Sequence, residues 1–322
     1  MSFQESNYHP WTVIALVGTL LVAGAVLSVF TPVLATLRGV VVVAFLCIVP
    51  GFLLLNLLEV REMEFGLYLT YGVALSLVSV TLVTVGTGRL LALLGWQRPF
   101  GFWTLGVVQS IFIAGLYWLA SRRGPQIGIP SSDVPRRTWT LAALCLLPVL
   151  AVIGVVLVRR YDSNLGMSLV VLFAGLVAVA AGAGTVDRTQ YPALVYSISL
   201  ATLLQRNLVS GHIVGGDIQA LYGTALAVTQ SGQLSAATAE TVFLLPVVTL
   251  VPAVLSELSG LDLVTIYTVV YVALASFVPV GLYYLGREVF DHDISLFGSL
   301  FFAFYPVTFL FTPGKQHLAE LF

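Results

Sequence analysis

The sequence has little charge, little cysteine and no excess of either sign of charge. Only 9% of its 322 residues are Asp, Glu, Lys or Arg, and the formal net charge is −1. A chain without a basic field is not expected to bind nucleic acid. Its two cysteines, Cys47 and Cys145, lie far apart in apolar runs. This placement indicates small core residues rather than a disulfide or a metal pair.

What the chain has in abundance is apolar sequence, since 58% of the residues are hydrophobic and the mean hydropathy is +1.00. Runs of about 20 apolar residues, enough to cross a hydrocarbon core of ~30 Å, recur along its length. We therefore predict an all-α, polytopic transmembrane helix bundle with about nine spans and one interfacial or re-entrant helix. The predicted spans are Trp11–Phe30, Arg38–Leu58, Phe65–Gly86, Trp103–Ala120, Trp139–Val158, Leu165–Gly184, Tyr191–Leu208, Ile266–Leu285 and Leu296–Phe311.

The segment Thr241–Leu258 is apolar but is interrupted by Pro246 and Pro252. Its apolar part is short for a span, so we predict a helix that lies at the interface or re-enters the membrane. Under this interpretation the last residues, Pro313–Phe322, return to the side of the membrane that carries Asp217.

Two small patterns within the spans predict helix packing. Ala174, Ala178 and Gly182 recur at a spacing of four residues, which predicts a smooth face that a neighbouring helix can approach closely. Gln109, inside the fourth predicted span, is expected to form a hydrogen bond with a neighbouring helix.

The orientation depends on where the basic residues lie. The 14 Lys and Arg residues divide evenly between the two sides of the predicted bundle, but the only cluster of four arginines falls in the loop Ser121–Thr138. Cytoplasmic loops are enriched in Lys and Arg, so we expect a multi-pass protein of the cell membrane with a cytoplasmic N-terminus. The first apolar run has no basic region before it and no small-residue cleavage site, which favours a retained span over a cleaved signal.

The stretch Gly211–Tyr222 directly follows the predicted span Tyr191–Leu208, and Asp217 is its only carboxylate. Gly215 and Gly216 allow a sharp bend, which would hold this short acid at the edge of the bilayer. Two interpretations stay open from the residues alone. Asp217 is either a solvated loop acid or an acid that faces a membrane-bound substrate.

Four stretches together resemble a family of prokaryotic multispanning proteins whose second half is similar to GT-C glycosyltransferases. The first is Arg38–Leu58, which contains a Pro-Gly-x-x-x-Leu element at Pro50–Leu55, with the run Glu64–Ser79 that follows it. The others are the turn Gly215–Gln219, the span Val269–Tyr284, and the basic-Gln-x-x-Ala-Glu element within Lys315–Phe322. The resemblance implies an N-terminal multispanning helical domain over residues 1–185 and the start of a GT-C-like transmembrane domain over 186–322. Because members of that family run longer, we expect this chain to be incomplete.

The resemblance implies transfer of a sugar from a polyprenyl- or dolichyl-phosphate donor at the outer face of the membrane. Asp217 would then be the catalytic base, with Glu320 as a second acid, and membrane lipid and the lipid-linked donor would be the partners. The residues expected to bind substrate are Lys315, Gln316, His317, Arg206 and His212. Leu221 stands where the family tends to have Glu, so a divalent metal is possible but no second loop carboxylate supports it.

The alternative function is non-enzymatic, as a transporter, a flippase component or an assembly partner in envelope polysaccharide synthesis. Transporters carry ionisable groups near the midplane on broken helices, whereas no predicted span here has an acid or a base at its centre. This absence counts against ion-coupled transport. Arg206 and His212 also have bland explanations, since an arginine at a span end can extend to the headgroups and a loop histidine is often solvated.

Overall fold

A computed structural model describes residues 32–60, 63–122, 138–213, 215–234, 242 and 245–304, and every regular element in these ranges is a helix. The expected all-α class is therefore confirmed for this part of the chain. The elements are α2 Pro32–Leu57, α3 Phe65–Leu93, α4 Phe102–Arg122, α5 Thr138–Tyr161, α6 Leu165–Gly182, η1 Arg188–Gln190, α7 Tyr191–Val209, α8 Gly216–Ser231, α10 Pro246–Ser259, α11 Leu263–Thr265, η2 Ile266–Val270, α12 Tyr271–Ala275, α13 Phe277–Arg287 and α14 His292–Phe304.

Five helices in the described ranges are long and apolar enough to cross a membrane. They are Val33–Leu57, Phe65–Leu93, Phe102–Arg122, Leu165–Gly182 and the continuous run Leu263–Arg287. Each coincides with a predicted span, which supports a multi-pass membrane protein. The predicted spans Trp139–Val158 and Tyr191–Leu208 fall on α5 and α7, and Leu296–Phe311 begins within α14. Trp11–Phe30 lies outside the described residues, and the full count of spans stays a prediction.

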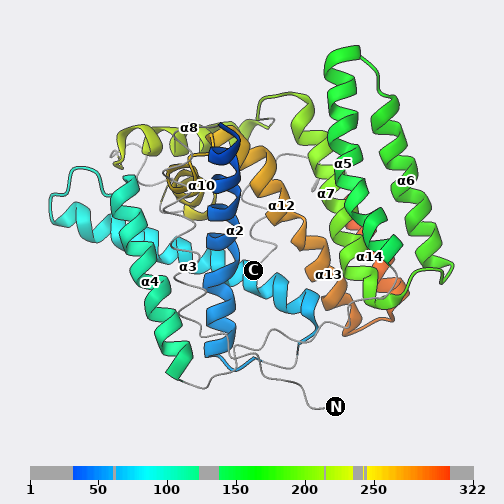
Figure 1. Ribbon diagram of the computed structural model, residues 1–322, viewed down its shortest axis with the longest axis horizontal. Helices are drawn as coiled ribbons and strands as arrows, with labels where there is room; N and C mark the ends of the chain where they lie inside the picture. Colours follow the sequence, from blue (N-terminus) through cyan, green and yellow to red (C-terminus); the bar gives the residue numbers. More distant parts are fainter. Residues whose placement is uncertain are drawn as a thin grey trace.

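An extensive helix contact joins α2 to α3, which passes behind α2 in Figure 1. Pro50 lies inside α2, and the backbone N–H of Gly51 donates to Ser76 Oγ of α3 at 2.7 Å. The two backbones meet at Gly51 and Gly72, where a Cβ on Gly51 would lie 1.8 Å from the Gly72 carbonyl oxygen. Small residues at such a crossing allow the backbones to approach each other. The Pro-Gly pair of the sequence is thus a packing element.

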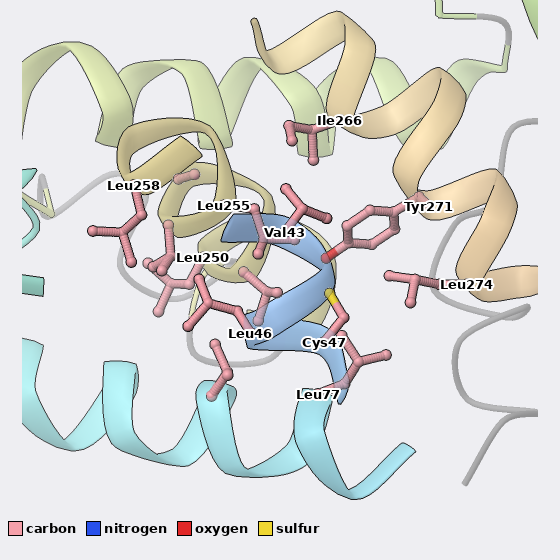
Figure 2. Packing of buried hydrophobic residues seen from close by; sticks show 14 of the residues in the cluster. Val43, Leu46, Cys47, Leu77, Leu250, Leu255, Leu258, Ile266, Tyr271 and Leu274 are labelled. Carbon is pink, nitrogen blue, oxygen red and sulfur yellow. The ribbon is translucent and has the colours of Figure 1, made fainter. Parts of the chain in front are cut away.

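Helix α10 is enclosed by protein, because every residue from Val248 to Ser256 is buried. It packs against α2, α3, α4, α8 and η2, and Figure 2 shows Leu250, Leu255 and Leu258 facing Leu46 and Leu77 in this core. A helix lying on the bilayer surface would expose a polar face. Burial on all sides therefore favours the re-entrant helix of the two predicted possibilities, and how the segment lies in the membrane stays a prediction.

Two tyrosines tie the span that begins at Leu263 to α10. Pro252 has no N–H, so the carbonyl of Val248 loses its usual helical donor. The Tyr267 hydroxyl donates to this carbonyl, and the Tyr271 hydroxyl donates to the carbonyl of Val247. Figure 2 shows the Tyr271 ring reaching into the core toward Cys47. The π-helical turn η2, which contains Tyr267, and the first residue of α12, Tyr271, therefore hold the first turn of α10 in place.

A second core joins α5, α6, α7, α13 and α14, on the right of Figure 1. Ala174 is buried in it, and a Cβ on Gly182 would come within 2.6 Å of the Phe297 ring of α14, so the predicted small-residue face does allow close packing. Gln109 donates to Thr84 of α3 at 3.3 Å, as expected for an intramembrane amide. Both cores draw on helices from either side of the predicted boundary at residue 185, and that boundary stays a prediction.

Candidate functional site

The candidate site lies at the end of the molecule where α5 and α7 finish and α8 lies across the bundle, at the top of Figure 1. We call this end the α8 face. The connection from α7 to α8 turns sharply, because Gly211 has φ +67° and Gly215, the N-cap of α8, has φ +128°. Glycine adopts such values readily because it has no Cβ. Gly215, one of the two glycines predicted to bend the chain, therefore lies in the turn before Asp217, whereas the other, Gly216, is the first residue of α8.

Asp217 lies in the first turn of α8 and its side chain is exposed. A carboxylate in this position interacts favourably with the amino end of the helix dipole. The next residue, Ile218, is buried, and Gln219 donates from Nε2 to the Ile213 carbonyl at 3.2 Å, which fastens the turn. The exposed acid is thus held by a packed helix rather than carried on a free loop.

Leu221 is only 5% exposed and belongs to the core beneath α8. The family that the sequence resembles tends to have Glu at this position. A carboxylate at 221 would enter the apolar core, so the departure from the family pattern matches the packing of this chain. No group of three His, Cys, Asp or Glu side chains in the described ranges could hold a metal ion.

Arg206 and His212 lie on the same connection as Asp217. Arg206 is exposed in the last turn of α7, while its neighbours Gln205 and Asn207 are buried. His212 is exposed, and its Nδ1 lies 2.9 Å from the carbonyl oxygen of Ser210. Three of the predicted site residues, Arg206, His212 and Asp217, therefore lie where α7 ends and α8 begins. The other predicted residues, Lys315, Gln316, His317 and Glu320, lie outside the described residues.

Arg159, at the end of α5, was not predicted as a site residue, yet it contacts the α7–α8 connection. Its Nε donates to the Val209 carbonyl at 3.1 Å. A Cβ on Gly211 would lie 2.5 Å from its NH2 group, so the guanidinium lies against this glycine. No local pattern around Arg159 indicates this role. The contact arises because α5 and α7 pack side by side and end at the same level.

Two more arginines close helix ends on the α8 face. Arg38 donates to the Ser259 carbonyl at the end of α10 at 3.4 Å, and Arg98 donates to the Gln230 carbonyl at the end of α8 at 3.3 Å. Cations near helix carboxyl ends satisfy carbonyls that lack helical donors and oppose the dipole. These two arginines thus fix the helices that frame the site.

A second polar cluster lies at the opposite end, where α13 ends and α7 and α14 begin. Asp293 accepts from Tyr191 at 2.9 Å and from Arg188 at 3.0 Å, and these two bonds hold the pKa of its carboxyl below the usual range. Arg287 forms an ion pair with Glu64 at 2.6 Å. Both carboxylates are satisfied by partners from other helices. This cluster therefore ties α3, α7, α13 and α14 together rather than offering a base.

Comparisons with known proteins add no name to this geometry. No family model, no curated protein and no solved structure matches the chain. The residues of the α8 face are therefore the basis for a proposed function.

Proposed function

We propose that this chain transfers a sugar from a polyprenyl- or dolichyl-phosphate donor at the membrane surface, with Asp217 as the base. One observation carries the proposal: Asp217 is exposed in the first turn of α8, on a glycine-built connection that an arginine of α5 also contacts. A carboxylate and basic groups at one membrane-facing end suit a reaction on a lipid-linked phosphate. The GT-C-like fold, the nine spans and an outward α8 face are parts of the same proposal.

The reaction requires a base for the acceptor hydroxyl and groups that stabilise the departing phosphate. The acceptor hydroxyl attacks the anomeric carbon, a new C–O bond forms, and the bond from that carbon to the phosphate oxygen breaks. Asp217 takes the proton of the hydroxyl, and the phosphate leaves with the bonding pair. Basic groups stabilise the charge that develops on it. Arg206 and His212 are the described candidates for substrate binding, and Lys315, Gln316, His317 and the second acid Glu320 complete the proposed set.

The alternative, a transporter, flippase component or assembly partner, is disfavoured in its ion-coupled form. The buried polar side chains of the described residues are Ser, Thr, Gln and Asn, with no Asp, Glu, Lys, Arg or His among them. An ion-coupled route commonly passes ionisable groups inside the bundle. The acids and bases described above lie instead at the two ends of the bundle.

The proposal is tested by incubating the purified chain, reconstituted in lipid vesicles, with radiolabelled polyprenyl-phosphate sugars. We expect more polyprenyl phosphate to be released than in protein-free vesicles. Nucleotide sugars, offered in place of the lipid-linked donor, should not serve as sugar donors. Chelation of divalent metals should leave the rate unchanged, because Leu221 replaces the second loop carboxylate. Release no higher than in the protein-free control, with every sugar and acceptor tried, would favour the non-enzymatic alternative.

A further inference from the structure

Arg159 is held on the candidate site by two separate contacts. Its Nε–H donates to Val209, the last residue of α7, at 3.1 Å. Its guanidinium also lies against Gly211, so closely that a Cβ there would overlap NH2. Gly211 is therefore required twice, for its φ of +67° and for the space that the guanidinium occupies. The side chain is thus positioned by the hydrogen bond of Nε and by the contact of NH2 with Gly211.

The terminal nitrogens of Arg159 remain available. The side chain is exposed, and Val209 is the one described residue to which it donates a hydrogen bond. NH1 and NH2 have no hydrogen-bond acceptor among the described residues, so their N–H groups can donate to a ligand as a planar fork. Such a fork matches the oxygens of a phosphate and binds them in pairs, which an ammonium group cannot do.

No carboxylate of the described residues pairs with Arg159. Asp293 pairs with Arg188 and Glu64 pairs with Arg287, both at the opposite end of the molecule. The guanidinium of Arg159 therefore keeps its charge for an anionic ligand.

We propose that Arg159 forms the phosphate subsite of the Asp217 site, so that the N-terminal half of the chain contributes to substrate binding. This inference rests on the proposed function in naming a polyprenyl-phosphate sugar as the ligand. Its chemical content is narrower: a phosphate ester at the membrane interface binds to NH1 and NH2 of Arg159. A donor phosphate and an ordinary lipid headgroup share this chemistry.

The test measures binding rather than transfer. The full chain in nanodiscs of neutral lipid is titrated with a polyprenyl phosphate, and the affinity is compared between wild type, Arg159→Gln and Arg160→Gln. We expect Arg159→Gln to weaken binding about tenfold or more, as the loss of a paired charge-assisted contact would. Arg160→Gln removes the same charge one residue away, and we expect it to change affinity less than about twofold. An equal loss of affinity in both variants would show an effect of surface charge alone and would contradict a phosphate subsite at Arg159.

A second variant keeps the test decisive if Arg159→Gln loosens the connection to Val209. Arg159→Lys keeps the charge and a donor but loses the fork, so we expect affinity between the wild type and Arg159→Gln. Wild-type affinity in Arg159→Lys would contradict binding by the fork.

Competition separates the possible sources of the phosphate. We expect neither phosphatidylglycerol at the same mole fraction nor inorganic phosphate to displace the polyprenyl phosphate. Displacement by phosphatidylglycerol would identify a general headgroup site, and displacement by inorganic phosphate a site for the free ion. Either result would overturn the assignment to the donor. Because the readout is binding, it can fail while transfer by the wild type stands, and the two proposals fail separately.

Discussion

Replacing Asp217 with asparagine is expected to lower the rate of sugar transfer about 100-fold or more, the usual contribution of a positioned general base. Asparagine keeps the size of the side chain and can still face the amino end of α8, but it cannot accept the acceptor proton. Because Asp217 is exposed and Ile218 and Leu221 supply the packing of α8, the fold should be unaffected. The measurement is the initial rate of polyprenyl-phosphate release in reconstituted vesicles, with thermal unfolding of each sample recorded alongside.

Asp162→Asn provides the matched control for this substitution. Asp162 is an exposed acid at the turn between α5 and α6, on the same face, and its φ of +51° is one that asparagine tolerates. Its substitution should leave the rate within about twofold of wild type, as expected for a surface acid outside the reaction. Wild-type transfer by a folded Asp217→Asn protein would remove Asp217 from the role of base.

The largest expected effect on stability comes from Gly51→Ala. The new Cβ would lie 1.8 Å from the Gly72 carbonyl oxygen and 2.8 Å from the Ser76 backbone nitrogen, and both are atoms of the α3 backbone. No side-chain rotation can relieve such an overlap, so α2 and α3 must separate. Overpacking of this kind costs about 2 to 3 kcal/mol. The separation also removes the hydrogen bond from Gly51 N–H to Ser76. Thermal unfolding of the detergent-solubilised protein should detect a marked fall in Tm.

Gly86→Ala on α3 is the control for that prediction. Gly86 is also a helical glycine, but it is exposed and nothing lies within 4 Å of the position of its Cβ. Alanine there should leave stability unchanged or raise it by about 0.5 to 1 kcal/mol, because glycine is costly inside a helix. Equal Tm values for the two variants would show that the crossing at Gly51 does not hold α2 against α3.

The long apolar runs predicted most of the fold, because a helix that faces lipid must be apolar along its whole length. Helix α8 was missed, and Gly211–Tyr222 was treated as a loop. The signal was present: Ile218, Leu221, Ala225 and Val228 are all buried and recur at the spacing of one helical face. For Thr241–Leu258, length and proline restricted the possibilities to two. Burial on all sides favours the re-entrant form, which stays a prediction, and this burial depends on neighbours that the segment itself does not encode.

The candidate site was predictable in part. Asp217 was found from its glycines and from its place after a predicted span, and Arg206 and His212 lie on the same connection. The contact of Arg159 with the α7–α8 connection could not be predicted from the sequence. Arg159 is distant in sequence and lies there only because α5 packs on α7. The burial of Leu221 was also not evident from its neighbours in the sequence. Local chemistry can therefore be recognised from short segments, whereas partners from other helices require the tertiary fold.

We expect the α8 face and the Arg287–Glu64 end to lie on opposite sides of one membrane. In this arrangement the span Leu263–Arg287 joins the two ends, and α10 does not cross. Single cysteines at the exposed positions Ala227 in α8 and Glu288 after α13 test it directly, in a protein whose Cys47 and Cys145 are replaced. A membrane-impermeant maleimide applied to sealed, oriented vesicles should label one of the two positions before lysis and the other only after it. Labelling of both from the same side would contradict the arrangement and would place the α8 face and the Arg287 end together.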